Sequence, residues 1–141
     1  MSAREQSTTP LLAAWLIALV STLAVIFIGE VLGQTPCILC WFQRAFMFPL
    51  AVILGIAVWR DDTGIRVYAI PLALIGALVA AWHMGLYIGV IPEAVQPCTA
   101  SGPSCTSQDM LVLGLPIPLL SLGAFTAIAA LPAARRTEIA Q

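Results

Sequence analysis

The residues of this chain best suited to chemistry are its four cysteines, which fall into two close pairs. Cys37 and Cys40 form a Cys-x-x-Cys pair within the stretch Pro36–Arg44, and Cys98 and Cys105 follow later in the chain. Such thiols exchange disulfides, form structural crosslinks or bind a soft metal ion. Four cysteines allow three pairings, and the simplest resting state joins 37 to 40 and 98 to 105.

Redox chemistry is the interpretation that we favour for both pairs. A Cys-x-x-Cys crosslink closes a very short loop, so it constrains the unfolded chain little and makes a weak structural staple. A zinc site formed by four cysteines is a further alternative. Two pairs on separate loops suit a thiol relay better, so we expect catalytic cysteines and no metal.

The surroundings of the first pair favour a reactive thiolate. Pro36 suits a helix start, which predicts that Cys37–Cys40 is the first turn of a helix. The positive end of a helix dipole favours a thiolate. Arg44 lies one turn after Cys40 and two turns after Cys37, so all three share one predicted face, where the guanidinium also favours a thiolate. The alternative for Arg44 is an interfacial side chain that reaches toward lipid headgroups.

Composition indicates that a membrane positions these residues. The chain has 141 residues, of which 60% are hydrophobic and 9% charged. Soluble domains are about half apolar and about a quarter charged. A net charge of −1 gives no electrostatic basis for nucleic-acid binding. We therefore expect an integral membrane protein, with residues 1–141 forming a single membrane domain.

Four apolar runs predict an all-α four-helix bundle. The first is too long for the core of a signal peptide. Pro71 interrupts the third run early, and Pro116 lies near the start of the fourth. The predicted spans cover residues 11–32, 41–59, 67–91 and 110–131.

The arginines predict the orientation of the bundle. The loops that carry the cysteine pairs contain no basic residue, if Arg44 is assigned to the second helix. Basic residues favour the cytoplasmic side. Both termini should therefore be cytoplasmic and both cysteine loops extracytoplasmic, where disulfides persist. The five arginines on the predicted cytoplasmic side are Arg4, Arg60, Arg66, Arg135 and Arg136.

Three polar residues near the predicted outer membrane boundary are further candidates. His83, the single histidine, is either a packing residue or part of a binding site. Glu30 could pair with Arg44, handle protons or face headgroups. Gln43 could donate a hydrogen bond to a ligand or simply lie at the interface.

Pro-Cys-Ile-Leu-Cys-Trp-Phe-Gln-Arg followed by an apolar helix resembles the DsbB family of disulfide bond formation proteins, in its compact BdbC-like branch. The resemblance extends to the second cysteine pair and to Ile-Pro-Leu-Leu-Ser-Leu-Gly-Ala-Phe in the fourth run. It implies a quinone-dependent protein-disulfide oxidoreductase in the bacterial cytoplasmic membrane. Its partner would be an extracytoplasmic thioredoxin-like thiol oxidase.

The resemblance also implies roles for individual residues. Cys98 would form the mixed disulfide with the partner, and Cys105 would then exchange with Cys37. Cys40 would face a quinone as a thiolate, with Arg44 and His83 near the quinone. The quinone could be ubiquinone or menaquinone.

Two other functions remain open from the residues alone. One is a small four-helix transporter that uses Glu30, and the other is a structural subunit with two structural disulfides. The transporter would want its carboxylate near the middle of the membrane, whereas Glu30 lies near the end of its span. The oligomeric state does not follow from the sequence.

Overall fold

The computed structural model describes residues 3–92, 111–112 and 114–139, and these form a bundle of helices. The side chains of residues 3–7 and 134–139 are not described. The helices are α1 (Ala3–Ile26), α2 (Ile38–Arg60), α3 (Arg66–Tyr87) and α4 (Ile117–Ile139). The shorter elements are the π turn η1 (Phe27–Val31), the 3-10 turn η2 (Thr63–Ile65) and the strands β1 (Leu111–Val112) and β2 (Leu115–Pro116).

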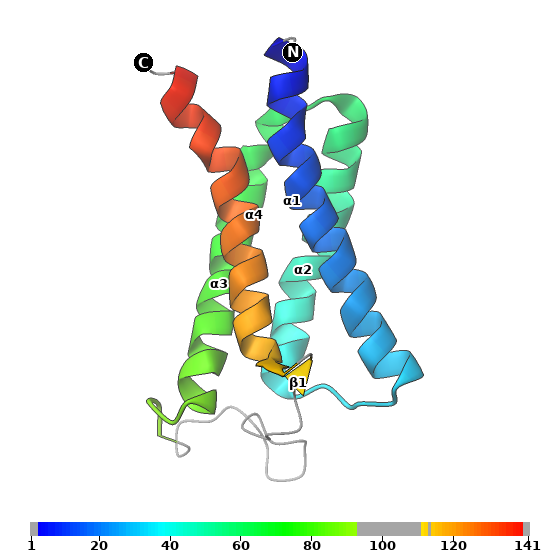
Figure 1. Ribbon diagram of the computed structural model, residues 1–141, viewed down its shortest axis with the longest axis vertical. Coiled ribbons are helices and arrows are strands. Elements are labelled where there is room, and N and C mark those ends of the chain that lie inside the picture. The colour runs from blue at the N-terminus through cyan, green and yellow to red at the C-terminus, as the bar shows by residue number, and fades with distance from the viewer. Residues whose placement is uncertain (1–2, 93–110, 113, 140–141) are drawn as a thin grey trace.

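The four helices run up and down beside one another (Figure 1). The most extensive packing is between α3 and α4, and α1 packs against both α2 and α4. Both chain ends lie at one end of the bundle, and the segment that enters α2 lies at the other (Figure 1). The predicted all-α four-helix architecture is therefore present.

Three segments are long and apolar enough to cross a membrane: Thr8–Val31, Ile38–Arg60 and Thr63–Tyr87. The apolar part of α4, Ile117–Ala133, is shorter. Large apolar side chains such as Val52 and Leu78 point outward and are exposed in the isolated chain. This arrangement is expected of helices that face lipid rather than water, because lipid tails solvate apolar side chains.

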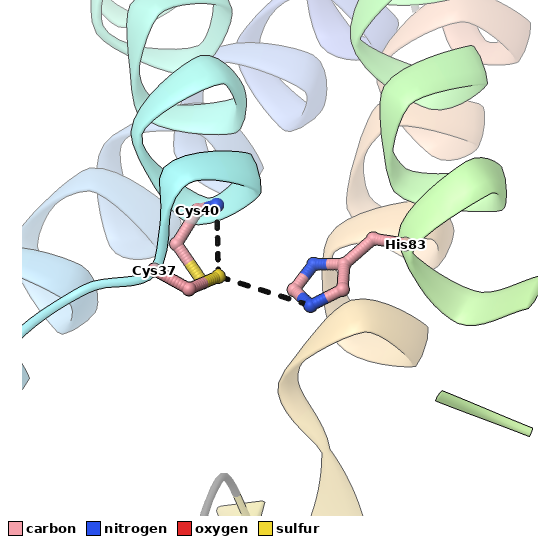
Figure 2. Close-up of side chains that lie close together, drawn as sticks. All are labelled: Cys37, Cys40 and His83. Atoms are coloured by element: carbon pink, nitrogen blue, oxygen red, sulfur yellow. Dashed lines mark hydrogen bonds between the residues drawn. The ribbon is translucent and has the colours of Figure 1, made fainter. Parts of the chain in front are cut away.

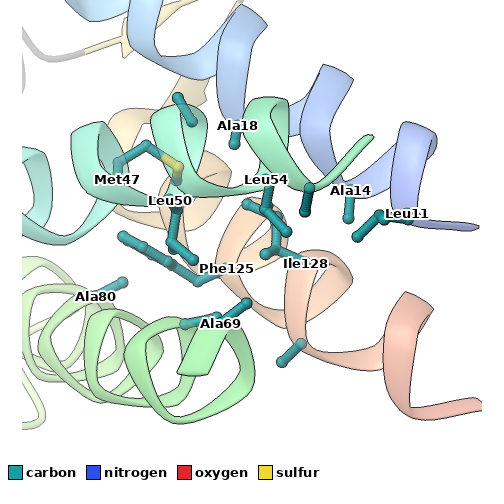
Figure 3. Packing of buried hydrophobic residues seen from close by; sticks show 14 residues of the cluster. Leu11, Ala14, Ala18, Met47, Leu50, Leu54, Ala69, Ala80, Phe125 and Ile128 are labelled. Atoms are coloured by element: carbon teal, nitrogen blue, oxygen red, sulfur yellow. The ribbon is translucent and has the colours of Figure 1, made fainter. Parts of the chain in front are cut away.

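Small residues explain the close approach of α3 and α4. Ala69, Ala73, Gly76 and Ala80 recur on one buried face of α3. Phe125 of α4 is fully buried, and a Cβ atom at Gly76 would lie 2.3 Å from its ring. The aromatic ring therefore fills the space that the missing side chain leaves, within the core drawn in Figure 3. Small residues promote helix contact in membranes by this means.

The helices depart from the predicted spans at several ends. The fourth apolar run was expected to begin at residue 110, but α4 begins at Ile117. Before it, β1 and β2 pair antiparallel, with Val112 opposite Leu115, and Gly114 adopts a positive φ of 80°. Pro116 lacks the N–H that a helix interior needs, which favours a helix start just after it.

Helices α1 and α3 also differ from the expected boundaries. The third span was predicted to reach residue 91, but α3 ends at Tyr87 and Gly89 adopts a positive φ of 75°. Pro71 lies inside α3 without ending it, contrary to the predicted interruption. The polar N-terminal residues, expected outside the first span, belong to α1 from Ala3 onward.

Candidate redox site

Cys37 lies at the N-terminus of α2, where its sulfur acts as the helix cap. Its backbone is extended, with φ −69° and ψ 168°, so the helix begins one residue later at Ile38. The Sγ atom of Cys37 accepts a hydrogen bond from the backbone N–H of Cys40 at 3.3 Å. The sequence predicted Cys37 as part of the first turn. The structure corrects this boundary, because the first backbone donors need an acceptor outside the helix.

The two cysteines of the Cys-x-x-Cys motif face each other. Their Sγ atoms lie 2.8 Å apart, and both thiols are free in the structure. Only a small movement separates this arrangement from a disulfide, in which the sulfur atoms are about 2.05 Å apart. The pair can therefore cycle between dithiol and disulfide without rearranging the helix.

His83 of α3 is the side chain that faces Cys37 from across the bundle. Its Nε2 atom lies 3.9 Å from Sγ of Cys37, and both residues are fully buried (Figure 2). Its other ring nitrogen, Nδ1, lies 3.1 Å from Nε2 of Gln43 on α2, which is also buried. Gln43 and Cys37 therefore hold the imidazole ring at both of its nitrogen atoms.

Arg44 occupies the opposite side of α2, toward α1. Its Nη2 donates a hydrogen bond to the carbonyl oxygen of Val25 at 3.0 Å, and its guanidinium lies 5.5 Å from the ring of Trp41. A Cβ atom at Gly29 would lie 3.3 Å from Nη2 of Arg44, so this glycine makes room for the guanidinium. The π turn at the end of α1 thus forms one wall of the arginine site, a common position for π turns in functional sites.

A cavity of about 310 Å³ adjoins Cys40 and Arg44. Most of its lining is apolar and comes from α1, α2, α4 and the segment that enters α2. Gln43 and Arg44 contribute polar groups, and Phe125 lines it from α4. Neither Cys37 nor His83 belongs to the lining. The two cysteines therefore have different neighbours, since Cys40 meets the cavity and Cys37 meets His83.

Hydrogen bonds favour the thiolate form of Cys37, which lies just before the membrane-spanning part of α2. The thiol of Cys40 is the strongest of these donors, and His83 and the Cys40 backbone N–H add to it. Burial opposes them, but together they hold the pKa of Cys37 well below its usual range. Cys37 is thus a better nucleophile at neutral pH than an ordinary buried thiol.

The structure brings together four of the predicted site residues: Cys37, Cys40, Arg44 and His83. The other two, Cys98 and Cys105, lie outside the described residues. Arg44 was expected to share a face with both cysteines, but only Cys40 lines the cavity beside it.

Two further features bear on the interpretation of the sequence. Glu30 is exposed, and within the described part of the chain no ion pair joins it to Arg44. The bond between Gln43 and His83 was not foreseen, because no local pattern links residues so far apart in sequence.

A soft metal ion would find suitable donors in the same cluster. Sγ of Cys37, Sγ of Cys40 and a ring nitrogen of His83 all lie within 4.8 Å of one another. Thiolates and imidazole are the preferred ligands of zinc. Our expectation that the chain uses no metal therefore stays a prediction.

Comparison with known proteins assigns the chain to a family. The family model described as disulfide bond formation protein DsbB matches residues 7–134. The chain therefore belongs to the DsbB family of disulfide bond formation proteins, which confirms the family predicted from the cysteine motif. No solved structure matches.

Several curated relatives cover most of the chain. A probable disulfide formation protein of Metapseudomonas resinovorans is 58% identical, over 86% of this chain and 85% of the relative. One from Deinococcus radiodurans is 42% identical, over 87% and 86%. Disulfide bond formation protein C of Bacillus subtilis is 38% identical, over 84% and 86%. This chain is thus similar in length to these proteins, which agrees with the predicted compact branch.

Proposed function

We propose that this protein is a membrane thiol:quinone oxidoreductase that reoxidises an extracytoplasmic thioredoxin-like dithiol oxidase. Electrons would pass from Cys98 and Cys105 to Cys37 and Cys40, and from there to a quinone. The observation that carries the proposal is the position of Cys40 and Arg44 on one apolar cavity beside a paired cysteine. Family membership supports the disulfide chemistry.

The cavity fits a quinone ring by size and chemistry. A volume of about 310 Å³ with a largely apolar lining suits a flat, apolar ring system. Two carbonyl oxygens on such a ring need donors, and Arg44 and Gln43 are available at the cavity wall. A bound quinone would supply the capacity to accept two electrons and two protons.

The residues of this chain would divide the work according to their surroundings. Arg44 would bind a carbonyl oxygen and stabilise negative charge that develops there, as fixed donors do in low-dielectric sites. Cys40 would present its sulfur to the cavity. Cys37, buried away from the cavity, would receive electrons through exchange with Cys105 and then close the disulfide with Cys40. Helix α1 and Phe125 would exclude water from the site.

The proposal includes an orientation and a partner. Both cysteine pairs would lie on the extracytoplasmic side of the bacterial cytoplasmic membrane, with both termini in the cytoplasm and residues 1–141 as one domain. The positions of the arginines support this orientation. A DsbA-type partner is among the most oxidising dithiols, at about −120 mV, so a quinone is a suitable final acceptor.

Reoxidation of a reduced, purified thioredoxin-like oxidase in the presence of this protein and a quinone tests the proposal. We expect Cys37→Ser, Cys40→Ser, Cys98→Ser and Cys105→Ser, made singly, each to abolish turnover. Full activity in all four variants would refute the electron path. Labelling of reduced Cys98 or Cys105 by an impermeant reagent from outside tests the orientation.

Two arginine variants test the role of the cavity in quinone binding. Arg44→Ala should raise the apparent KM for quinone about tenfold or more, because it removes a charged donor worth about 1.5–3 kcal/mol. Arg60→Ala is the matched control, since Arg60 is exposed at the far end of α2 and should leave the KM unchanged. An equal KM in the two variants would contradict the role given to Arg44.

A further inference from the structure

Gln43 and His83 form a buried pair, and the proposed electron path does not use the hydrogen bond between them. Both are polar, Gln43 is 5% exposed and His83 is fully buried. Burying polar groups is unfavourable unless they are hydrogen-bonded, and their mutual hydrogen bond of 3.1 Å offsets part of that cost. The far ring nitrogen of His83 points at Sγ of Cys37, which a purely structural pair would not need.

The bond from Gln43 selects one tautomer of the imidazole. Nε2 of Gln43 is an amide nitrogen, which only donates, so Nδ1 of His83 accepts. A neutral imidazole that accepts at Nδ1 carries its proton on Nε2. That N–H lies against the Cys37 sulfur at 3.9 Å (Figure 2). The side chain of His83 is therefore arranged to donate to Cys37.

Three donors converge on the Cys37 sulfur from different directions. They are the thiol of Cys40 at 2.8 Å, the backbone N–H of Cys40 at 3.3 Å and the ring of His83 at 3.9 Å. Two of them come from Cys40, within α2 itself. The third comes from α3, and it depends on the orientation of one ring.

We propose that Gln43 is a positioning residue that holds His83 as an Nε2–H donor, and that His83 thereby stabilises the Cys37 thiolate for disulfide closure. This deepens the proposed function, on which it rests for the direction of electron flow. As the S–S bond forms, the Cys37 thiolate and the Cys40 thiol would give up two electrons and one proton to the quinone, so the proton stays on Cys40 until closure, in contrast to the Cys40 thiolate that the resemblance implies. Water supplies the second proton.

In the described part of the chain, the other charged groups near the site do not face Cys37. Arg44 points toward the cavity, and Glu30 is exposed at the end of α1. The described part of α4 with side chains, residues 117–133, contains no titratable residue. Among the described residues, the groups that act on the ionisation of Cys37 are thus Cys40 and His83.

The test measures the thiolate of Cys37 directly and uses neither quinone nor partner. In a parent with Cys40→Ser, Cys98→Ser and Cys105→Ser, Cys37 is the single thiol, and its alkylation by iodoacetamide is followed from about pH 4 to about pH 10. The rate reports the thiolate fraction. We expect Gln43→Leu and His83→Phe each to move the midpoint upward by about one pH unit, which slows alkylation about tenfold below the midpoint.

Two further variants separate positioning from packing. Gln43→Glu replaces this donor by a carboxylate that accepts from a protonated Nδ1, which favours the imidazolium and retains a proton on Nε2, so its midpoint should stay at or below that of the parent. Leu86→Ala removes a buried apolar side chain from the same cluster as Cys37, and because it lessens burial it should not raise the midpoint. Both measurements remain informative if Gln43→Leu does not fold.

The outcomes are distinct. An unchanged midpoint in His83→Phe, or a shift in His83→Phe without one in Gln43→Leu, overturns the proposal. A shift in Leu86→Ala as large as that in Gln43→Leu also overturns it, because packing would then explain the effect. If the midpoints behave as expected while quinone reduction is absent, the proposed function fails and this arrangement stands.

Discussion

The contact between Gly76 and Phe125 predicts that even one added methyl group, in Gly76→Ala, destabilises the protein. In Gly76→Ala, the new Cβ atom would lie 2.3 Å from Cε1 of Phe125 and 2.6 Å from Cδ1 and Cζ. Ordinary carbon contacts are about 3.5–4.0 Å, so atoms must move by about 1 Å or more. Phe125 is fully buried and tightly surrounded by the core. Helices α3 and α4 must therefore separate, or the ring must leave its pocket.

The magnitude follows from known costs of overpacking. Extra methylene groups in a packed interior destabilise by about 1–3 kcal/mol. Alanine is intrinsically better than glycine in a helix by about 0.8–1 kcal/mol. Gly123→Ala is the matched control, because Gly123 lies in α4 with nothing within 4 Å of the point that a Cβ atom would occupy. Both variants gain the helix propensity of alanine, so this term cancels, and they should differ in unfolding free energy by the overpacking term, roughly 1–3 kcal/mol.

Unfolding in mixed micelles with an increasing fraction of dodecyl sulfate, followed by circular dichroism, measures this difference. Gly76→Ala should unfold at a lower denaturant fraction than the parent, and Gly123→Ala at the same or a higher one. Because Phe125 also lines the cavity, Gly76→Ala should in addition raise the KM for quinone. Equal stability of the two alanine variants would refute the reasoning, since it would mean that α3 and α4 can move apart without a loss of unfolding free energy.

Three smaller perturbations follow from other contacts. Gly29→Val should displace the guanidinium of Arg44 and raise the quinone KM about tenfold, measured by initial rates, since a charge-assisted hydrogen bond is worth about 1.5–3 kcal/mol. Thr22→Val should raise the unfolding free energy by about 1 kcal/mol, because the buried Oγ1 has no hydrogen-bond partner among the described residues. Asp61→Val should be less stable than Asp61→Gly by about 1–2 kcal/mol, because residue 61 ends α2 in the left-handed region with φ 53°.

Each of these has a simple control. Gly29→Ala should have a smaller effect on the KM than Gly29→Val, and the reverse order would contradict the steric argument. Thr22→Ser keeps the hydroxyl, so a gain in stability equal to that of Thr22→Val would show that the hydroxyl is not the cause. For Asp61, equal stability of the valine and glycine variants would show that backbone strain does not decide the preference.

The sequence predicted well what depends on neighbours within one helix. Composition alone identified a membrane protein, because a 60% hydrophobic chain has too few polar residues to cover a soluble surface. The spacing of Cys40 and Arg44 placed them on one side of a helix, and both line the cavity. Helical periodicity is local, so it can be read from a single chain.

Helix ends were predicted less accurately, for a local reason that competes with hydropathy. Apolar runs continue through turns in a membrane protein, so hydropathy does not mark where a helix stops. The boundaries of α4 and α3 were decided by backbone geometry at Pro116 and Gly89. Cys37 lies outside α2 because its sulfur caps the helix, a role that spacing does not reveal.

The division of the two cysteines between different surroundings was decided by tertiary structure. Cys37 and Cys40 are three residues apart, but one faces His83 of α3 and the other faces a cavity bounded by α1 and α4. Contacts between helices depend on how closely their backbones approach, which small residues such as Gly76 control. The sequence by itself therefore determined the class of protein and the reactive motif, whereas packing determined which groups each sulfur meets.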